Sequence, residues 1–357
     1  MKSKIKASHV SWIFFLSAMI SMNSIPVHKA IAKGGSDIGL LIIGHGYFSQ
    51  DQKFYEFVNE VQNRLPKNPV DSGLHMVMDM QTNKMWQTED EAIRRFESKK
   101  VKKVVVIPLY MNTNVSTVDV IKWSIGCQVD GDPGKSNYLE EIVECPDSYD
   151  SENNLCIHMG GIHRRFHDFS DIQYIATNAI DYHPDISKVF LERALEFSTD
   201  KGNELVLLIG HGDGDDDIDN DYRNKVLAKY ASDVKSMGEF YDVQYGTLRE
   251  DWCDQKRSAV EEIRNKIIAA YNAGRKVIWV PARISSWSKV HDQQWDPQDC
   301  SVQDARDSLG IKDLFDAGMY TKANYLLYKP TSLADWAVSM FEEAVKKDQY
   351  IDCLNAK

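Results

Sequence analysis

An internal repeat constrains the fold of this chain more than any other feature. Two aliphatic runs end in the same Gly-His-Gly turn, at residues 44–46 and 210–212. A short, continuous aliphatic block that stops at glycine is typical of a buried parallel strand. Valine-rich runs that end in proline, at 104–108 and 277–281, repeat at nearly the same spacing. We therefore infer a tandem duplication.

Predicted strands alternate with amphipathic helices in both halves of the chain. The second strand is expected near 74–80 in the first half and near 240–248 in the second half. The last strand is expected at 172–177 and at 324–328, and each is followed by a final helix. Strands that alternate with helices predict a parallel sheet wound by right-handed crossovers.

We therefore expect an α/β fold of two similar domains, each a four-stranded parallel sheet flanked by helices. The first domain should cover residues 36–200, with an insertion at about 126–168, and the second should cover residues 201–350. Each half should end with a final helix, at 186–197 and at 332–347.

The N-terminus has the features of a signal peptide. Lysines at positions 2, 4 and 6 precede an apolar stretch at 10–22, and Ala-Ile-Ala at 30–32 matches a cleavage signal. An uncleaved anchor is the alternative, but the stretch is shorter than the roughly 20 residues that span a bilayer. We expect residues 1–32 to be removed and the mature chain to be periplasmic or secreted, with no later membrane span.

Charge and cysteine content exclude several classes of protein. The formal net charge of −11 argues against a nucleic-acid binder, because a phosphate backbone is met by a basic face. Six cysteines without Cys-x-x-Cys spacing are too few for a disulfide scaffold and do not form a structural zinc motif. Cys253 and Cys300 are one possible bridge among many pairings in an oxidising compartment.

His45 and His211 follow the first strand of each half, where a parallel sheet presents side chains at its carboxyl edge. Flanking glycines allow a sharp turn that leaves the imidazole uncovered. Neutral imidazole suits proton transfer or a borderline metal ion. For one such histidine, burial against a backbone carbonyl is the alternative, but two histidines at equivalent strand ends favour a functional role.

Three motifs together resemble the class II tetrapyrrole chelatases, in particular the sirohydrochlorin cobaltochelatase (CbiX-like) family. They are the Gly-His-Gly turns, Val-Val-Val-Ile-Pro-Leu-Tyr-Met at 104–111 and Ala-Ile-Asp-Tyr-His-Pro at 179–184, and the likeness extends over most of 36–350. The resemblance implies a tandem chelatase, preceded by a signal peptide, that inserts Co²⁺ or Fe²⁺ into sirohydrochlorin between its halves without ATP. The metal ion is then a substrate, the tetrapyrrole is the partner, no prosthetic group is needed, and a monomer is sufficient.

The family pattern also assigns candidate residues. It implies catalytic roles for His45, His211, Asp79 and Glu250, the last two at the second-strand position where the family often has an acid, although either can be a solvated residue at a strand end. The family's second histidine, after the third strand, has no direct match. Its place falls near Ser116 in the first half, and in the second half His291 lies slightly further on. His45, His211 and His291 are therefore the predicted metal ligands, although His291 can equally be an exposed loop residue.

A histidine cluster, an acidic run and three tryptophans each have two possible interpretations. The histidines at 158, 163 and 167, the last two at helical spacing beside two arginines, fit either a cationic surface for carboxylates or a solvated face. The acidic run 213–221 is either a route for cations or a solvated loop. Three tryptophans can stack on a macrocycle or pack in the core: Trp252, Trp287 and Trp295. Because the second histidine is missing, a non-catalytic protein that binds a metal ion or tetrapyrrole is the alternative function.

Overall fold

The computed structural model describes residues 36–46, 51–75, 78–79, 84–85, 89–126, 148–150, 155–158, 161–163, 170–249, 251–284 and 311–347. The expected signal peptide, Glu250 and His291 lie outside these ranges. Within them, no helix has the length and apolar character needed to cross a membrane.

The first half is a parallel sheet with the strand order β2-β1-β5-β9. Its elements are β1 (Ile38–Gly44), α1 (Asp51–Arg64), β2 (Val70–Leu74), α2 (Glu89–Ser98), β5 (Lys103–Pro108), α3 (Ser116–Ser124), β9 (Gln173–Ala176) and α5 (Pro184–Leu195). All three strand pairings in this sheet are parallel.

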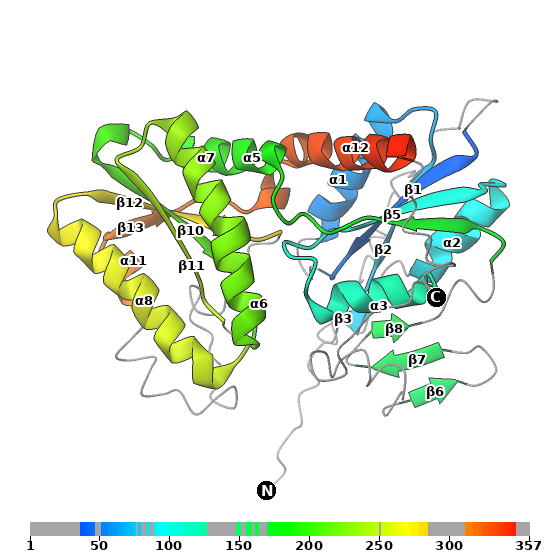
Figure 1. Ribbon diagram of the computed structural model, residues 1–357, viewed down its shortest axis with the longest axis horizontal. Coiled ribbons are helices and arrows are strands. Elements are labelled where there is room, and N and C mark those ends of the chain that lie inside the picture. Colours follow the sequence, from blue (N-terminus) through cyan, green and yellow to red (C-terminus); the bar gives the residue numbers. More distant parts are fainter. Residues whose placement is uncertain are drawn as a thin grey trace, which may run out of the picture.

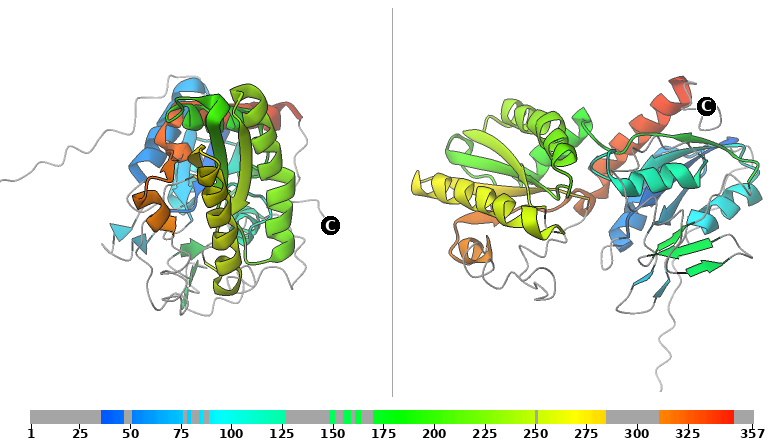
Figure 2. Two further views of the ribbon diagram at one scale, coloured as in Figure 1. Left: turned by 90° about the vertical axis from the view of Figure 1, so that its left-hand side faces the viewer. Right: turned by 60° about the horizontal axis from the view of Figure 1, so that its bottom comes forward.

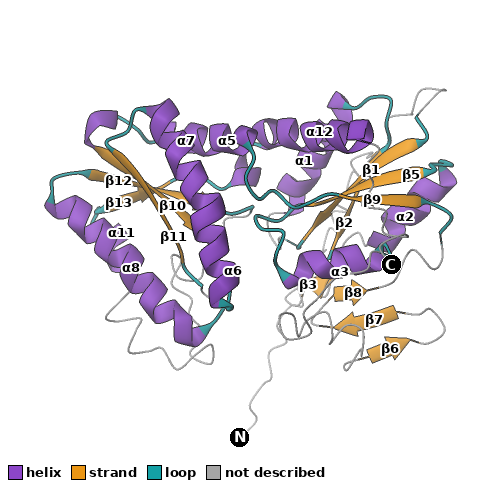
Figure 3. Ribbon diagram, viewed as in Figure 1, coloured by secondary structure: helices purple, strands orange, loops and turns teal. Residues whose placement is uncertain are grey.

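The second half repeats this connectivity with the order β11-β10-β12-β13, again wholly parallel. Its elements are η3 (Lys201–Asn203), β10 (Glu204–Gly210), α6 (Asp216–Asp221), the π-helix η4 (Tyr222–Leu227), α7 (Ala228–Gly238), β11 (Asp242–Thr247), α8 (Cys253–Asn272), β12 (Lys276–Ala282), α11 (Ile311–Asp316), β13 (Tyr320–Lys322), η5 (Leu326–Tyr328) and α12 (Pro330–Lys347). The expected α/β fold with two four-stranded parallel sheets flanked by helices is therefore confirmed, as Figure 3 shows.

The strand register places the two Gly-His-Gly turns at equivalent positions. Gly44 pairs with Leu74 at the end of β2, and Gly210 pairs with Thr247 at the end of β11. Both turns therefore lie at the carboxyl edge of a central strand, as the repeat predicted.

Two strands differ from their expected positions. The second strand of the first half is β2, which ends at Leu74, and Met78–Asp79 forms the short strand β3 that pairs antiparallel with β4 (Lys84–Met85). The sequence pattern missed β2 because the strand contains the polar residues Asp71 and Ser72, which break the apolar run. Asp71 can be buried there because it accepts hydrogen bonds from Arg95 at 2.8 and 2.9 Å. Gly73 is needed in β2, since a Cβ there would lie 2.7 Å from the Cα of Glu89.

The last strand of the second half is β13, before the expected range 324–328. The amide of Ala323 makes the final bond of this ladder, to the carbonyl of Trp279 at 2.7 Å. After it the chain turns into the 3₁₀ helix η5, whose Leu326 and Leu327 amides bond to the carbonyls of Arg283 and Ile284.

The two halves exchange the helices that close them. Helix α12, red in Figures 1 and 2, packs on α1 and β5 of the first half, whereas α5 packs on α7 and β12 of the second half. The guanidinium of Arg64 pairs with Asp335 and donates to the carbonyl of Thr331 at 2.9 Å. Each sheet is therefore covered by the final helix of the other half of the chain, and the chain boundaries 36–200 and 201–350 stay predictions.

The exchange produces one continuous hydrophobic core. Buried residues of α1, α5, α7 and α12 join one face of each sheet in a single cluster that includes Phe57, Phe190, Tyr230 and Trp336. Two smaller clusters cover the opposite faces, under α2 and α3 in the first half and under α8 and α11 in the second. The two sheets are thus held through a shared layer of helices.

The expected insertion contributes a separate three-stranded antiparallel sheet of β6 (Ser148–Asp150), β7 (Leu155–His158) and β8 (Gly161–His163). His158 and His163 lie on neighbouring strands of this sheet. The expected helical face at 163–167 is therefore wrong at His163, and His167 lies outside the described residues.

Candidate functional site

The first turn presents a half-buried histidine with a defined tautomer. Gly46 has φ 113°, a backbone conformation that favours glycine. Nδ1 of His45 lies 3.2 Å from the carbonyl oxygen of Gly46, which can only accept a hydrogen bond. This contact places the ring proton on Nδ1 and the lone pair on Nε2, the form in which imidazole binds a metal ion.

Burial favours the neutral form of this ring. Desolvation lowers the pKa of His45 to about 4, against the hydrogen bond to Gly46, which raises it. The charges of His75 and His211 lower it further, and the charge of Asp251 raises it. His45 is therefore neutral at pH 7, and His75, His211 and Asp251 lie within the range at which their charges act on it.

The second turn holds its histidine differently. Nδ1 of His211 lies 2.9 Å from the carbonyl of Gly212, and Nε2 lies 2.9 Å from a carboxylate oxygen of Asp251. Both ring nitrogens therefore face acceptors, and both contacts are hydrogen bonds when the ring is an imidazolium. Trp252 covers one side edge-on, with ring centroids 5.5 Å apart. The side chains of His211 and Asp251 are 37% and 58% exposed, so this pair can exchange protons with solvent.

His75 and Glu89 form a buried pair next to the first turn. The amide of His75 donates to the carbonyl of Gly44 at 2.8 Å, and Nδ1 of His75 lies 3.5 Å from the Glu89 carboxylate. Burial lowers the pKa of His75 to about 4 and raises the pKa of Glu89 to about 8. The second half has Leu248 in the equivalent place, bonded to the carbonyl of Gly210 at 3.2 Å. The two halves thus share a backbone but not their chemistry.

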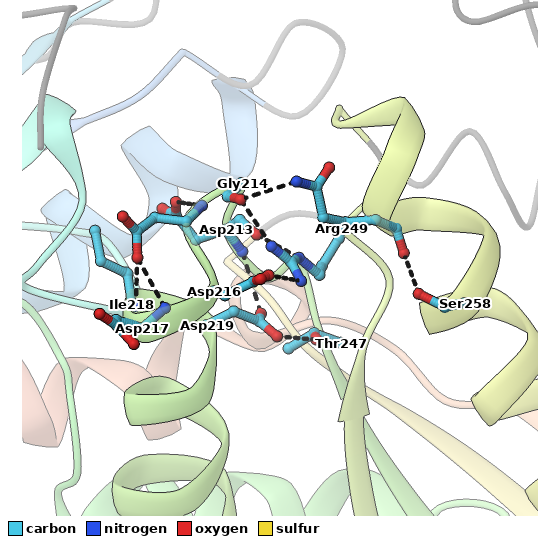
Figure 4. A network of polar contacts seen from close by, with 11 residues as sticks. Asp213, Gly214, Asp216, Asp217, Ile218, Asp219, Thr247, Arg249 and Ser258 are labelled. Carbon is cyan, nitrogen blue, oxygen red and sulfur yellow. Dashed lines mark hydrogen bonds and ion pairs between the residues drawn. The ribbon is translucent and has the colours of Figure 1, made fainter.

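The acidic run after His211 is a folded turn rather than an open loop, as Figure 4 shows. Asp215 caps α6 by accepting from the amides of Asp217 and Ile218 at 2.8 and 3.0 Å. Asp219 is buried and accepts from the hydroxyl of Thr247 at 3.1 Å. Burial raises the pKa of this carboxyl. Most of the run is therefore occupied with local hydrogen bonds.

The structure brings together only some of the residues predicted from the sequence. The charges of His211, His75 and Asp251 act on the pKa of His45, and the sequence pattern had singled out neither His75 nor Asp251. Asp79 lies in β3, beyond the end of β2. Glu250, His291, Trp287, Trp295 and Cys300 fall outside the described residues.

No described residue supplies a second histidine after β5. Thr113 is held there by Asp181, which accepts from its amide at 2.7 Å and from its hydroxyl at 2.5 Å. Ser116 begins α3. Among the described residues, no group of three or more His, Cys, Asp and Glu side chains is arranged to hold a metal ion.

Comparison with known proteins finds a solved structure with a similar architecture. No protein-family model and no curated protein sequence matches the chain. SirB from Bacillus subtilis with Fe³⁺ superposes with a TM-score of 0.52 at 13% sequence identity, covering 88% of this chain and 99% of that chain. The sirohydrochlorin chelatase SirB from Bacillus subtilis subspecies spizizenii, in complex with cobalt, gives a TM-score of 0.49 at 11% identity, covering 88% and 98%. The likeness to the first structure shows that the chain shares the two-domain fold of that protein.

Proposed function

We propose that this protein is a tetrapyrrole metal chelatase that inserts Co²⁺ or Fe²⁺ into sirohydrochlorin without ATP. The observation that carries the proposal is a pair of equivalent turns whose histidines have different hydrogen-bond partners and interact electrostatically. Metal insertion releases two pyrrole protons for each metal ion bound. The site must therefore supply a metal ligand and a proton acceptor, and the two turns offer one each.

His45 is the proposed metal ligand. Its proton is fixed on Nδ1 by Gly46, so Nε2 points its lone pair away from the turn. Imidazole nitrogen suits both cobalt and iron ions. Because burial keeps the ring neutral, His45 does not have to lose a proton before it binds the cation.

His211 and Asp251 form the proposed proton acceptor. When His211 takes a pyrrole proton, the Asp251 carboxylate at 2.9 Å stabilises the imidazolium that results. The exposure of both side chains then lets the proton leave to solvent. Asp79, Glu250 and His291 remain proposed for the second proton or for an additional metal ligand, on the family resemblance alone.

An absorbance assay tests the enzyme. Purified mature protein is mixed anaerobically with sirohydrochlorin and Co²⁺, and conversion is followed beside a sample without protein and beside a His183→Ala variant. His183 caps α5 and has no place in the proposed site, so this variant should retain the wild-type rate. Conversion no faster than in the sample without protein contradicts the proposal.

A binding protein without turnover is the second candidate function. The observation in its favour is the segment after β5, where Asp181 fixes Thr113 and no imidazole takes the place of the family's second histidine. In the same assay this candidate predicts a stoichiometric spectral shift, complete at one equivalent, with no further conversion.

We also propose that the protein is exported and acts as a monomer. The basic N-terminus, the apolar stretch and the Ala-Ile-Ala motif support cleavage after residue 32. The tandem halves supply both turns in one chain, so a second subunit is not needed. N-terminal sequencing of the protein from its native host should begin at Lys33, and light scattering should give the mass of one chain.

A further inference from the structure

We propose that Arg249 is a positioning residue that holds His211 and Asp251 together. Its side chain is only 11% exposed and lies between the end of β11 and the start of α6. The inference goes beyond the proposed function in naming a residue that touches no substrate. Of the experiments that test it, only the measurement of turnover depends on chelatase activity.

The backbone of Arg249 fixes both ends of the pair. Its amide donates to the carbonyl of His211 at 2.6 Å, directly behind the imidazole. Its φ of 48° is left-handed, which is uncommon for a residue with a side chain. The amide of Trp252 then bonds back to the carbonyl of Arg249 at 3.2 Å, so the chain reverses within four residues. This reversal turns Asp251 back toward His211.

The guanidinium of Arg249 fixes the segment after His211. It donates to the carbonyls of Asp213 and Gly214 at 2.5 and 2.7 Å and pairs with the carboxylate of Asp216 at 2.6 Å. Figure 4 shows these contacts meeting on one side chain. A planar fork of donors can satisfy three acceptors at once, which a lysine ammonium cannot do in this geometry.

Close packing leaves the segment little freedom around this arginine. Gly212 has φ 85°, and a Cβ there would lie 2.7 Å from the Arg249 side chain. A Cβ on Gly214 would lie 2.2 Å from the indole nitrogen of Trp252, whose ring contacts His211. Gln255, in the first turn of α8, also donates to the carbonyl of Gly214, at 3.3 Å. The loop, the arginine and the histidine therefore form one packed unit.

NMR of the histidine rings tests this role without metal or tetrapyrrole. Protein labelled with ¹⁵N-histidine gives a His211 Nε2 signal, which is assigned by its loss in His211→Ala. The expected result is that Arg249→Ala shifts this signal in the same direction as Asp251→Asn does, and that the double variant shifts it no further than Asp251→Asn alone. Arg264→Ala removes another arginine of the same half, one paired with Asp313 at 2.7 and 2.9 Å, and should leave the signal unchanged.

A second variant guards against misfolding. If Arg249→Ala does not fold, Arg249→Lys keeps the charge but loses the fork, and should shift the signal as well. A His211 signal that stays at its wild-type position in either folded variant overturns the proposal.

Measuring the rate of Co²⁺ insertion distinguishes a failure of the proposed Arg249 role from a failure of the proposed chelatase function. Arg249→Lys should lower kcat for Co²⁺ insertion about 100-fold, the typical cost of a misplaced group, and leave KM for Co²⁺ unchanged. A shifted His211 signal in a protein that never inserts metal supports Arg249 and refutes the chelatase. An unshifted signal in a protein that does insert metal refutes Arg249 and leaves the chelatase standing.

Discussion

At the scale of single residues, the two turns differ in what surrounds their histidines. His45 is half-buried, with its proton directed to Gly46, whereas His211 has acceptors at both ring nitrogens. A duplicated backbone has therefore produced one ring suited to a cation and one suited to a proton. This asymmetry follows from neighbours that differ between the halves, such as Asp251.

Metal titration should separate the two rings. In isothermal titration with Co²⁺, His45→Ala should weaken binding by more than about 100-fold, because loss of a ligand exceeds the 10- to 100-fold cost of losing a supporting partner. His211→Ala should change the affinity less than about threefold, well below that range. Equal losses in the two variants would contradict the assigned roles.

The buried pair behind His45 predicts a pH dependence of stability. The pKa of Glu89 is raised from 4.5 to about 8, so its contribution to stability is complete below pH 4.5 and is lost as the pH rises through 8. The pKa of His75 is lowered from 6.5 to about 4, so its contribution is complete above pH 6.5 and is lost as the pH falls through 4. Between pH 6.5 and 8, only Glu89 of this pair titrates, and the free energy of unfolding should fall.

Urea unfolding at pH 6.5 and pH 8 measures this fall. Glu89→Gln cannot ionise and should flatten it, whereas Glu56→Gln, a change at a partly exposed carboxylate of α1, should keep the wild-type dependence. A Glu89→Gln variant that still loses the wild-type amount of stability over this range would refute the assignment.

The sequence identified the histidines but not the groups that distinguish them. Gly-His-Gly at a strand end is a local pattern, so His45 and His211 were predictable. His75 and Asp251 matter through their distance from these rings, and that distance depends on where β2 and β11 end. The β2 strand was placed too late because its buried Asp71 breaks the apolar pattern. Since Asp251 follows the predicted Glu250 directly, an acidic pair at this edge was the available signal.

At the scale of elements, the exchange of α5 and α12 is what joins the halves. Both helices were predicted from their amphipathic patterns, but a pattern shows only that a helix has an apolar face and not which sheet covers it. Short connections favour packing on the nearest sheet, and here the packing of α12 on α1 overrides that preference. The last helix of the chain therefore stabilises the first domain.

Substitution of a buried tryptophan tests this arrangement. Trp336 of α12 is 0% exposed, and Trp336→Ala should cost about 3 to 5 kcal/mol of unfolding free energy. Asp335→Ala, at the neighbouring position with a 66% exposed side chain, should cost less than about 1 kcal/mol.

Hydrogen exchange shows which half of the protein loses stability in Trp336→Ala. The substitution should weaken amide protection in α1, in the first half, before it does so in α8. Loss of protection confined to the second half would contradict the helix exchange.

At the scale of the whole molecule, the tandem fold brings two carboxyl edges together within one chain. The likeness to SirB concerns this architecture, and the charges that act on His45 come from both halves. In the proposed reaction, a metal ion at the first turn and a proton acceptor at the second act on one macrocycle. The proposed function thus assigns the metal ion to His45 and the proton to His211 with Asp251.

Anaerobic Co²⁺ insertion into sirohydrochlorin, with rate and affinity measured in the same variants, tests this assignment of roles. His45→Ala should lose both Co²⁺ binding and turnover, whereas Asp251→Asn should keep the wild-type affinity for Co²⁺ and lower kcat by about 10- to 100-fold, as the loss of a supporting partner does. The His183→Ala control should match the wild-type protein in both. Wild-type turnover in Asp251→Asn, or unchanged Co²⁺ binding in His45→Ala, would contradict it.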